Sequence, residues 1–298
     1  MRGSAIVCDG RPHHLALHFD QPSSTYSLLV DGKVDATASF GAPDDSPADW
    51  VVEAGTNFAA GGYVTGVAYD YFDTQPVRGL RLSGVAVQHV GWGLGREDVT
   101  DFQAVSYLST AAVHLVDAHG CSLNDVAVQH VGGMGVWVEG GSSEVGLASC
   151  LVEDVGAGGV RVGRGQPLSN EQPGKVTHSV WVNNSKILRG SQVYQAGNGV
   201  LLQNSPNFTL TRTEVAYFNH VAVTLGWVWG FALPPATHSN RVEYNHVHHV
   251  GNGDLSDLGG IYALGVQPGT MIRCELMGLD VCDANVYGVT CVMRMCMA

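Results

Sequence analysis

The residues best suited to chemistry lie close together in one stretch of the chain, between Asn240 and Thr270. The stretch contains three histidines and two aspartates, which are His246, His248, His249, Asp254 and Asp257. Neutral imidazoles bind metal ions or exchange hydrogen bonds, and carboxyl groups transfer protons or attack as nucleophiles. Which of these reactions is open depends on the elements that position the side chains.

The histidines are spaced as on a β-strand. Side chains at alternate positions of a strand point to the same face, so His246 and His248 share one face. The sequence offers no third metal ligand at a suitable spacing. We therefore expect no metal or other cofactor here, and we interpret His246, His248 and His249 as groups that hydrogen-bond a sugar or form a stacked surface ladder.

Two tryptophans, Trp227 and Trp229, precede this region in the motif Gly-Trp-Val-Trp-Gly. Their alternate positions direct both rings to the same side. Aromatic faces bind sugar rings by stacking on their C–H groups, which makes the pair a candidate for substrate binding. The same rings could equally pack the loop that carries them onto the rest of the protein, and both interpretations stay open.

The elements that hold these residues belong to an internal repeat. A Gly or Ala followed by Val or Ile opens a short apolar strand again and again. The second residues of these pairs are Val113, Val136, Val160, Val200, Val223 and Ile261. Their spacings of 23, 24, 40, 23 and 38 residues indicate a coil of 23 or 24 residues, with insertions in two coils. The heptapeptide Val-Ala-Val-Gln-His-Val-Gly also occurs twice, at Val85–Gly91 and Val126–Gly132.

Within each unit apolar residues alternate with others, as in Val136 and Val138, which is typical of a strand with one inward face. A second strand follows in each unit, at 126–128, 149–152, 213–215 and 242–244. Asparagines at four predicted turns, Asn184, Asn204, Asn219 and Asn245, fit because Asn tolerates left-handed backbone geometry.

These features predict an all-β chain whose main part is a right-handed parallel β-helix, a solenoid in which each strand pairs with its copies in the adjacent coils. Leucine-rich repeats need a Leu-x-x-Leu-x-Leu frame that the chain lacks, and propeller blades need about 40 residues each. We expect the inserted loops, about 163–180 and 226–240, to project from one side and wall a cleft.

Composition narrows the range of partners. The net charge of −12, with 15 Lys and Arg in 298 residues, argues against nucleic acid, which is bound by clustered cations. The sequence contains no stretch of about 18 apolar residues that would predict a membrane span. Its first ten residues lack the layout of a signal peptide. Neutral sugars, or anionic sugars with a bridging cation, remain as partners.

The two ends differ from the repeat. Residues 1–77 contain a strand at 13–20 and another at 26–33, with Asp31-Gly32 as a hairpin signal. This pair resembles late strands of the laminin-G or concanavalin-like jelly roll, so we expect a partial β-sandwich; an unrelated β-sandwich cap is the alternative. After Gly269-Thr270 the repeat fades and Met and Cys accumulate, and we interpret residues 289–298 as an aberrant or truncated tail. The seven cysteines match no zinc pattern, and we expect buried or free thiols.

The segment 240–270 resembles β-helical glycoside hydrolases of family 141, a group with fucosidase and xylanase activities. The motif Ser-Asp-Leu-Gly-Gly-Ile-Tyr at Ser256–Tyr262 carries the resemblance most specifically, and the similarity covers about 78–288. It implies a pectin lyase-like fold, cleavage of O-glycosyl bonds, Tyr262 in substrate binding, and an extracellular or cell-surface location of the parent protein.

Such hydrolases need two carboxyl groups about 5 to 9.5 Å apart. Adjacent coils lie about 4.8 Å apart, so carboxylates on one column of neighbouring coils meet this requirement. We expect Asp257 to be the catalytic acid or nucleophile, although an Asp before Gly-Gly also suits a turn cap. The family's further Asp-Glu-Gly coil should follow Gly288 and is replaced by another sequence, so we expect little hydrolysis.

The sequence therefore predicts a β-helical, monomeric protein of the glycoside-hydrolase type that acts on cell-wall polysaccharide or oligosaccharide. The alternative is a polysaccharide-binding or surface structural protein on the same scaffold. A β-helical lyase or epimerase would need a basic residue beside a calcium-binding carboxylate cluster, which the sequence supports less well.

Overall fold

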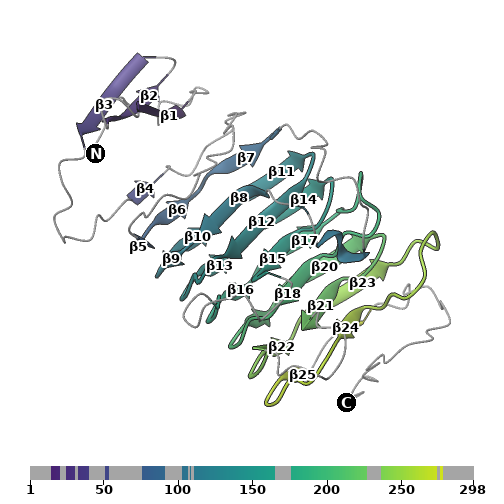
Figure 1. Cartoon of the computed structure of the whole chain (residues 1–298). Coiled ribbons are helices and arrows are strands. Elements are labelled where there is room, and N and C mark those ends of the chain that lie inside the picture. The colour runs from purple at the N-terminus through teal and green to yellow at the C-terminus, as the bar shows by residue number, and fades with distance from the viewer. Residues whose placement is uncertain are drawn as a thin grey trace.

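The fold is an all-β solenoid in a computed structural model (Figure 1). The structure describes residues 15–20, 25–30, 33–39, 51–53, 76–90, 103–106, 108, 111–164, 176–226, 236–273 and 276–277. The one helical element in these ranges is a short 3-10 turn at Gln103–Val105.

Three stacked parallel sheets form the faces of the solenoid (Figure 1). The first has eight strands: β4 (Val51–Glu53), β6 (Arg81–Ser83), β10 (Ser122–Asn124), β13 (Gly146–Ala148), β16 (Trp181–Asn183), β19 (Thr209–Thr211), β22 (Arg241–Glu243) and β25 (Met271–Arg273). The second has seven: β7 (Ala86–Gln88), β11 (Ala127–Val131), β14 (Leu151–Val155), β17 (Lys186–Leu188), β20 (Glu214–Phe218), β23 (His246–Val250) and β26 (Leu276–Met277). The third has six: β8 (Ala111–Val116), β12 (Met134–Glu139), β15 (Val160–Val162), β18 (Val200–Gln203), β21 (Val223–Gly226) and β24 (Ile261–Ala263).

The chain visits the three sheets in turn, so one coil consists of three short strands. A parallel pair, β5 (Val77–Arg78) and β9 (Ala118–His119), adds to the early coils. This arrangement confirms the predicted parallel β-helix.

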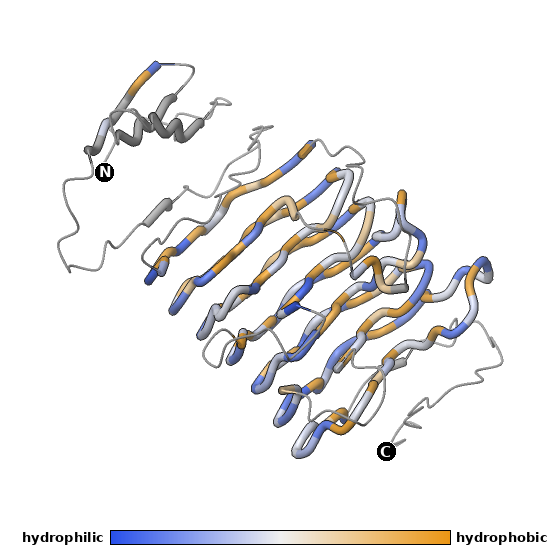
Figure 2. The backbone as a smooth tube through the Cα atoms, in the orientation of Figure 1, coloured by the Kyte–Doolittle hydropathy of each residue, from blue (hydrophilic) through white to orange (hydrophobic). Residues whose placement is uncertain are grey.

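The predicted repeat register is confirmed residue by residue. Val136 pairs with Val113 and with Val160, and the same column continues through Val200 and Val223 to Ile261. The six positions lie in one sheet because the same pattern of apolar residues recurs in every coil and directs the same side chains inward. Figure 2 shows the apolar segments recurring at matching places in successive coils.

The two copies of the heptapeptide also stack in register. Ala86, Val87 and Gln88 pair with Ala127, Val128 and Gln129. On the outer face Gln88 Nε2 donates a hydrogen bond to Gln129 Oε1 at 3.0 Å. Identical outward side chains therefore satisfy one another along the stack.

The Gly of the Gly-Val pair is required by close packing between coils. A Cβ on Gly159 would lie 2.6 Å from the carbonyl oxygen of Gly199 and 2.4 Å from Cγ2 of Ile187. Gly135 has the same relation to the carbonyl oxygen of Gly159. The signature thus marks positions where backbones approach closely.

Corners between the sheets repeat a left-handed backbone conformation. Asn184 and Asn204 take positive φ angles of 49° and 45°, as the sequence predicts. Asn219 and Asn245 are not among the positive-φ residues, so the expectation is wrong for them. Asn245 is instead buried, and its Oδ1 accepts a hydrogen bond from Thr213 N at 3.0 Å, because the preceding residue, Tyr244, takes the left-handed position at this corner with φ 59°.

One strand assignment from the sequence needs correction. The sequence pattern places the strand at 242–244 with the second strands of the other units, yet Arg241–Glu243 belongs to the eight-stranded sheet. The member of the seven-stranded sheet in this coil is β23, which pairs with β20. Each of these two strands begins with one polar residue followed by a buried valine, Val242 or Val247, so the first residues of the two strands do not distinguish the sheets.

The N-terminal strands β1 (Leu15–Asp20), β2 (Thr25–Val30) and β3 (Lys33–Ser39) form an antiparallel sheet. Val30 pairs with Lys33, which agrees with a hairpin at Asp31-Gly32, although these two residues lie outside the described ranges. Strand β4 pairs in parallel with β6, so the eight-stranded sheet begins before residue 78.

The stack also extends past the point where the sequence repeat fades. Strand β25 pairs with β22, and β26 pairs with β23, so pairing continues to Met277.

Cys121 and Cys150 are buried free thiols, as expected, and burial raises the pKa of both. The four late cysteines and the proposed tail lie outside the described residues.

Candidate functional site

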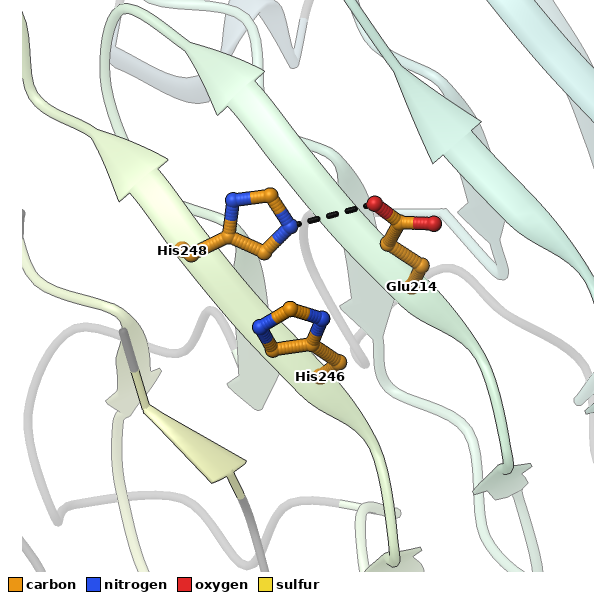
Figure 3. Close-up of side chains that lie close together, drawn as sticks. All are labelled: Glu214, His246 and His248. Carbon is orange, nitrogen blue, oxygen red and sulfur yellow. Dashed lines mark hydrogen bonds and ion pairs between the residues drawn. The ribbon is translucent and has the colours of Figure 1, made fainter.

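Glu214, His246 and His248 meet on the outer face of the seven-stranded sheet (Figure 3). Strand β23 supplies both histidines and β20, one coil earlier, supplies the glutamate, because Glu214 pairs with His246. His248 Nε2 lies 3.1 Å from Glu214 Oε1. The rings of His246 and His248 face each other with centroids 4.1 Å apart, so strand pairing has gathered three polar side chains.

Two further rings surround the cluster. His249 Nδ1 lies 2.6 Å from His248 Nδ1, so these two imidazoles share a hydrogen bond. The ring of Tyr217 contacts His249 at 4.7 Å and His248 edge-on at 5.5 Å. His248 is buried by these neighbours, whereas Tyr217 remains 44% exposed. The buried imidazole is held on both of its nitrogens.

The surroundings set the charges of the cluster. Burial acts to raise the pKa of Glu214, but hydrogen bonds from His248 and Lys186 outweigh it and lower the pKa overall. For His246, burial and then repulsion by His248 lower the pKa of the imidazole. Near neutral pH the cluster therefore contains a carboxylate and at least one neutral imidazole with a free lone pair.

An open hollow adjoins the cluster at the corner between the eight-stranded and seven-stranded sheets. Its lining residues are of polar types apart from one exposed tyrosine, and their carbon atoms supply much of the surface; the residues are Asn184, Ser185, Lys186, Arg212, Thr213, Glu214, Tyr244, Asn245 and His246. Such a lining offers hydrogen-bond donors, acceptors and an aromatic face to a solute. His246 and Glu214 connect the hollow to the histidine cluster.

Sequence reasoning placed His246 and His248 on one face and missed Glu214. The missing signal was the pairing of residue 214 with residue 246. Coil lengths vary, so the sequence alone does not align Glu214 with the histidines. Had the strand at His246–Val250 been assigned to the same sheet as the one at 213–215, the third polar group would have been found.

Asp257 lies at the entrance to β24 and is half-buried, with a left-handed φ of 58°. Its Oδ1 accepts a hydrogen bond from the Tyr262 hydroxyl at 3.0 Å. Burial and this interaction with Asp257 raise the pKa of Tyr262 to about 12, so the phenol stays a donor. Tyr262 is only 5% exposed, so its side chain offers little surface to a substrate and serves mainly to hold the Asp257 carboxylate in place.

The other carboxylates near this region are placed differently. Glu243 is buried in the eight-stranded sheet, where Arg241 and Arg273 pair with it. Asp254 is exposed on the loop before β24. Trp227 and Trp229 lie outside the described residues, as do most of the loops at 163–180 and 226–240, so the predicted cleft stays a prediction.

The outer face of the six-stranded sheet holds a buried polar group that sequence reasoning missed. Glu139, whose side chain is 4% exposed, accepts two hydrogen bonds from Arg164, at 2.6 and 2.9 Å. His114 Nε2 lies 2.9 Å from the same carboxylate. The adjacent Trp137 is covered by Arg161, whose guanidinium lies 4.1 Å from the ring centroid.

This carboxylate predicts an acid-sensitive stability. Burial acts to raise the pKa of Glu139, but His114 and Arg164 outweigh it, so the pKa falls below 4.5. Because the pKa is lower in the folded protein than in the unfolded chain, the ionised carboxylate stabilises the fold at pH values above the unfolded pKa. This stabilisation is lost as the pH falls through the folded pKa. We expect Glu139→Gln to cost about 1–3 kcal/mol at pH 7 and progressively less below pH 4.5, measured by urea unfolding. The control Glu144→Gln, at an exposed residue, should leave the free energy of unfolding unchanged at pH 7 and at lower pH. A cost of Glu139→Gln that is the same at every pH would contradict the assignment.

No protein-family model matches the sequence, and no curated protein matches it significantly. A solved structure described as a glycoside hydrolase has a TM-score of 0.55 and 18% identity, covering 67% of this chain and 40% of that chain. This chain thus spans less than half of that structure, and the likeness concerns the fold. The enzymatically active domain of a tailspike protein from bacteriophage CBA120 has a TM-score of 0.43 and 13% identity over 76% of this chain and 29% of that one. An alginate lyase from a Paenibacillus species has a TM-score of 0.34 and 11% identity over 72% of this chain and 78% of that one.

Among the described residues, no helix has the length and hydropathy to span a membrane.

Proposed function

We propose that this protein acts on cell-wall polysaccharide outside the cell as a β-helical protein of the glycoside-hydrolase type. The observation that carries the proposal is the half-buried Asp257, held by the Tyr262 hydroxyl at 3.0 Å at the entrance to β24. These two residues belong to the segment that resembles family 141, and a glycoside hydrolase shares the fold. In this proposal Asp257 is the catalytic acid or nucleophile and Tyr262 positions it.

The polar hollow supports a role in sugar binding. Tyr244 is 54% exposed beside it, and His246 contributes to its lining. Lys186 and Arg212 line the same hollow and would donate hydrogen bonds to sugar hydroxyl or carboxylate oxygens. We propose that a polysaccharide chain lies across this corner, with Trp227 and Trp229 as further contacts.

A non-catalytic binding protein is the second candidate, and the placement of Glu243 favours it. Hydrolysis needs a second carboxyl group about 5 to 9.5 Å from the first. Glu243 forms ion pairs with two arginines in the eight-stranded sheet, whereas Asp257 precedes a strand of the six-stranded sheet. Asp254 is exposed on the loop before β24. A chain that binds polysaccharide without cleaving it would have this arrangement.

The domain division into 1–77, 78–288 and 289–298 is part of the proposal. The antiparallel sheet of β1, β2 and β3 supports a laminin-G-like segment ahead of the solenoid. The pairing of β4 with β6 shows that the end of this segment also contributes to the solenoid. We propose a monomer, because the core side chains of the described coils pack against one another within one chain.

The function is tested with the full chain on xylan and on fucosylated polysaccharide. We expect retardation in affinity electrophoresis, and slow release of reducing ends that Asp257→Asn lowers by at least about 100-fold, the lower end of the range for loss of a general acid. Asp254→Asn is the matched control, because it makes the same change three residues away on the exposed loop, and it should leave both properties intact.

Three outcomes decide between the candidates. Hydrolysis lost in Asp257→Asn and kept in Asp254→Asn identifies an enzyme that uses Asp257. Binding without any release of reducing ends identifies the binding protein. Neither binding nor release on any polysaccharide would contradict both.

A further inference from the structure

We propose that Glu214, His246 and His248 form a binding site for a divalent transition-metal ion such as Zn²⁺. Two imidazoles and one carboxylate are a frequent protein ligand set for zinc and for other ions of this class. The proposal does not depend on hydrolysis at Asp257, although His246 and Glu214 also line the hollow proposed to bind sugar. It also revises the expectation from sequence that no metal binds at the histidines.

The strand geometry delivers the three ligands to one point. Parallel pairing of β20 with β23 fixes the backbones, and each residue projects from the same outer face (Figure 3). One candidate ligand atom from each side chain lies within 4.8 Å of the other two. Atoms bound to one tetrahedral zinc ion at about 2.1 Å are about 3.4 Å apart. Binding in this proposal therefore draws the three side chains together by rotation of their side-chain bonds.

The neighbours of His248 hold it as a metal ligand is usually held. Ligating histidines commonly donate their second N–H to a fixed acceptor, which sets the tautomer and the ring orientation. His248 directs Nε2 to Glu214 at 3.1 Å, and its Nδ1 lies 2.6 Å from His249 Nδ1. With a metal on Nε2, the proton of His248 resides on Nδ1 and is donated to His249. Tyr217 packs against both rings and limits their rotation.

The site combines a buried ligand with an open entrance. His248 is buried, whereas the Glu214 side chain is 28% exposed and His246 lines the hollow. An ion can therefore enter from the hollow. Three protein ligands leave at least one coordination position for water or a solute oxygen, as in catalytic zinc sites.

Lys186 competes with the ion. Its Nζ lies 3.2 Å from Glu214 Oε2, so the ammonium and His248 together satisfy the carboxylate in the structure. The Lys186 side chain is 63% exposed and can turn into solvent when a cation takes its place. Removal of this positive charge should therefore strengthen metal binding, an effect opposite to that of removing a ligand.

The test is titration of the full chain with Zn²⁺ alone by isothermal calorimetry. We expect one binding event that His246→Ala, His248→Ala and Glu214→Gln each weaken by at least about tenfold, since even outer partners of metal ligands are worth about 10- to 100-fold. His249→Ala should weaken binding by about tenfold. Lys186→Gln should tighten it several-fold. Circular dichroism of each variant confirms that the fold is retained.

Two controls separate this site from other zinc ligands. His130 forms a 2.6 Å pair with Asp154 on the same sheet, and among the described residues no third candidate ligand atom lies within 4.8 Å of both, so His130→Ala should bind as the wild type does. Co²⁺ spectra distinguish cysteine sites by sulfur-to-cobalt charge transfer, and the bands lost in His246→Ala should be those of nitrogen and oxygen ligands. The proposal is overturned if the wild type binds no Zn²⁺, or if His246→Ala and His248→Ala bind it as tightly as the wild type.

Discussion

Replacement of Phe218 by alanine is expected to destabilise the solenoid by about 3–5 kcal/mol, the usual cost of removing a buried phenylalanine. The ring is 1% exposed and belongs to the central core. It fills the space beside Gly190, where an added Cβ would clash with it, and it lies near Gly159 and Gly199. These glycines leave a gap that only a large side chain fills, so alanine would leave a cavity across neighbouring coils.

Urea unfolding measures the effect, with two comparisons. Phe218→Leu retains most of the volume and should cost less than half as much, because overall packing is kept. Tyr217→Ala removes a neighbouring ring that is 44% exposed and should cost about 1 kcal/mol or less, as surface substitutions usually do. Equal losses for Phe218→Ala and Tyr217→Ala would show that the ring does not fill the gap.

Arg161→Ala is expected to cost about 3 kcal/mol or more, because several hydrogen bonds to a charged group are lost and their acceptors stay buried. Arg161 is 2% exposed, and burial lowers the pKa of its guanidinium to about 10. It donates to Gln203 Oε1 at 2.8 Å and to the carbonyl oxygens of Leu108 and Ser106 at 3.0 and 2.7 Å. The side chain thus ties the segment around 103–108 onto the six-stranded sheet.

The same variant should release that segment. Hydrogen exchange in peptides covering 103–108 should accelerate more than exchange in the strands of the sheet, since the segment loses its two bonds to Arg161. Arg189→Ala is the matched control: the Arg189 side chain is 58% exposed and pairs with Glu153, so its loss should cost less than about 1 kcal/mol. Unchanged exchange around 103–108 in Arg161→Ala would mean that other contacts hold the segment.

The stacking of the solenoid was predictable from the amino-acid sequence. Gly-Val pairs mark positions where coils touch, and alternating valines direct one face inward, so the column from Val113 to Ile261 was predictable in register. The two heptapeptides were equally informative, because residues of one copy pair with the identical residues of the other copy in the adjacent coil. Short-range patterning suffices here because every coil repeats the same contacts.

The eight-stranded sheet could not be predicted in the same way. Its strands are each three residues long, and some of them, such as Ser122–Asn124 and Thr209–Thr211, bury only the central residue. One apolar residue has no period, so nothing in the local sequence separates such a strand from a loop. Parallel pairing with the coils on either side is what makes these residues strands.

The outer surfaces were also decided by the tertiary structure. Alternation predicts an exposed outer half for β12, yet all six of its residues are buried, partly because Arg161 and Arg164 cover Trp137. Likewise, His246 and His248 were visible as a pair in the sequence, but Glu214 joins them only through pairing between coils of different length. The sequence thus determined which side chains enter the core, while the register between coils decided which polar side chains meet outside it.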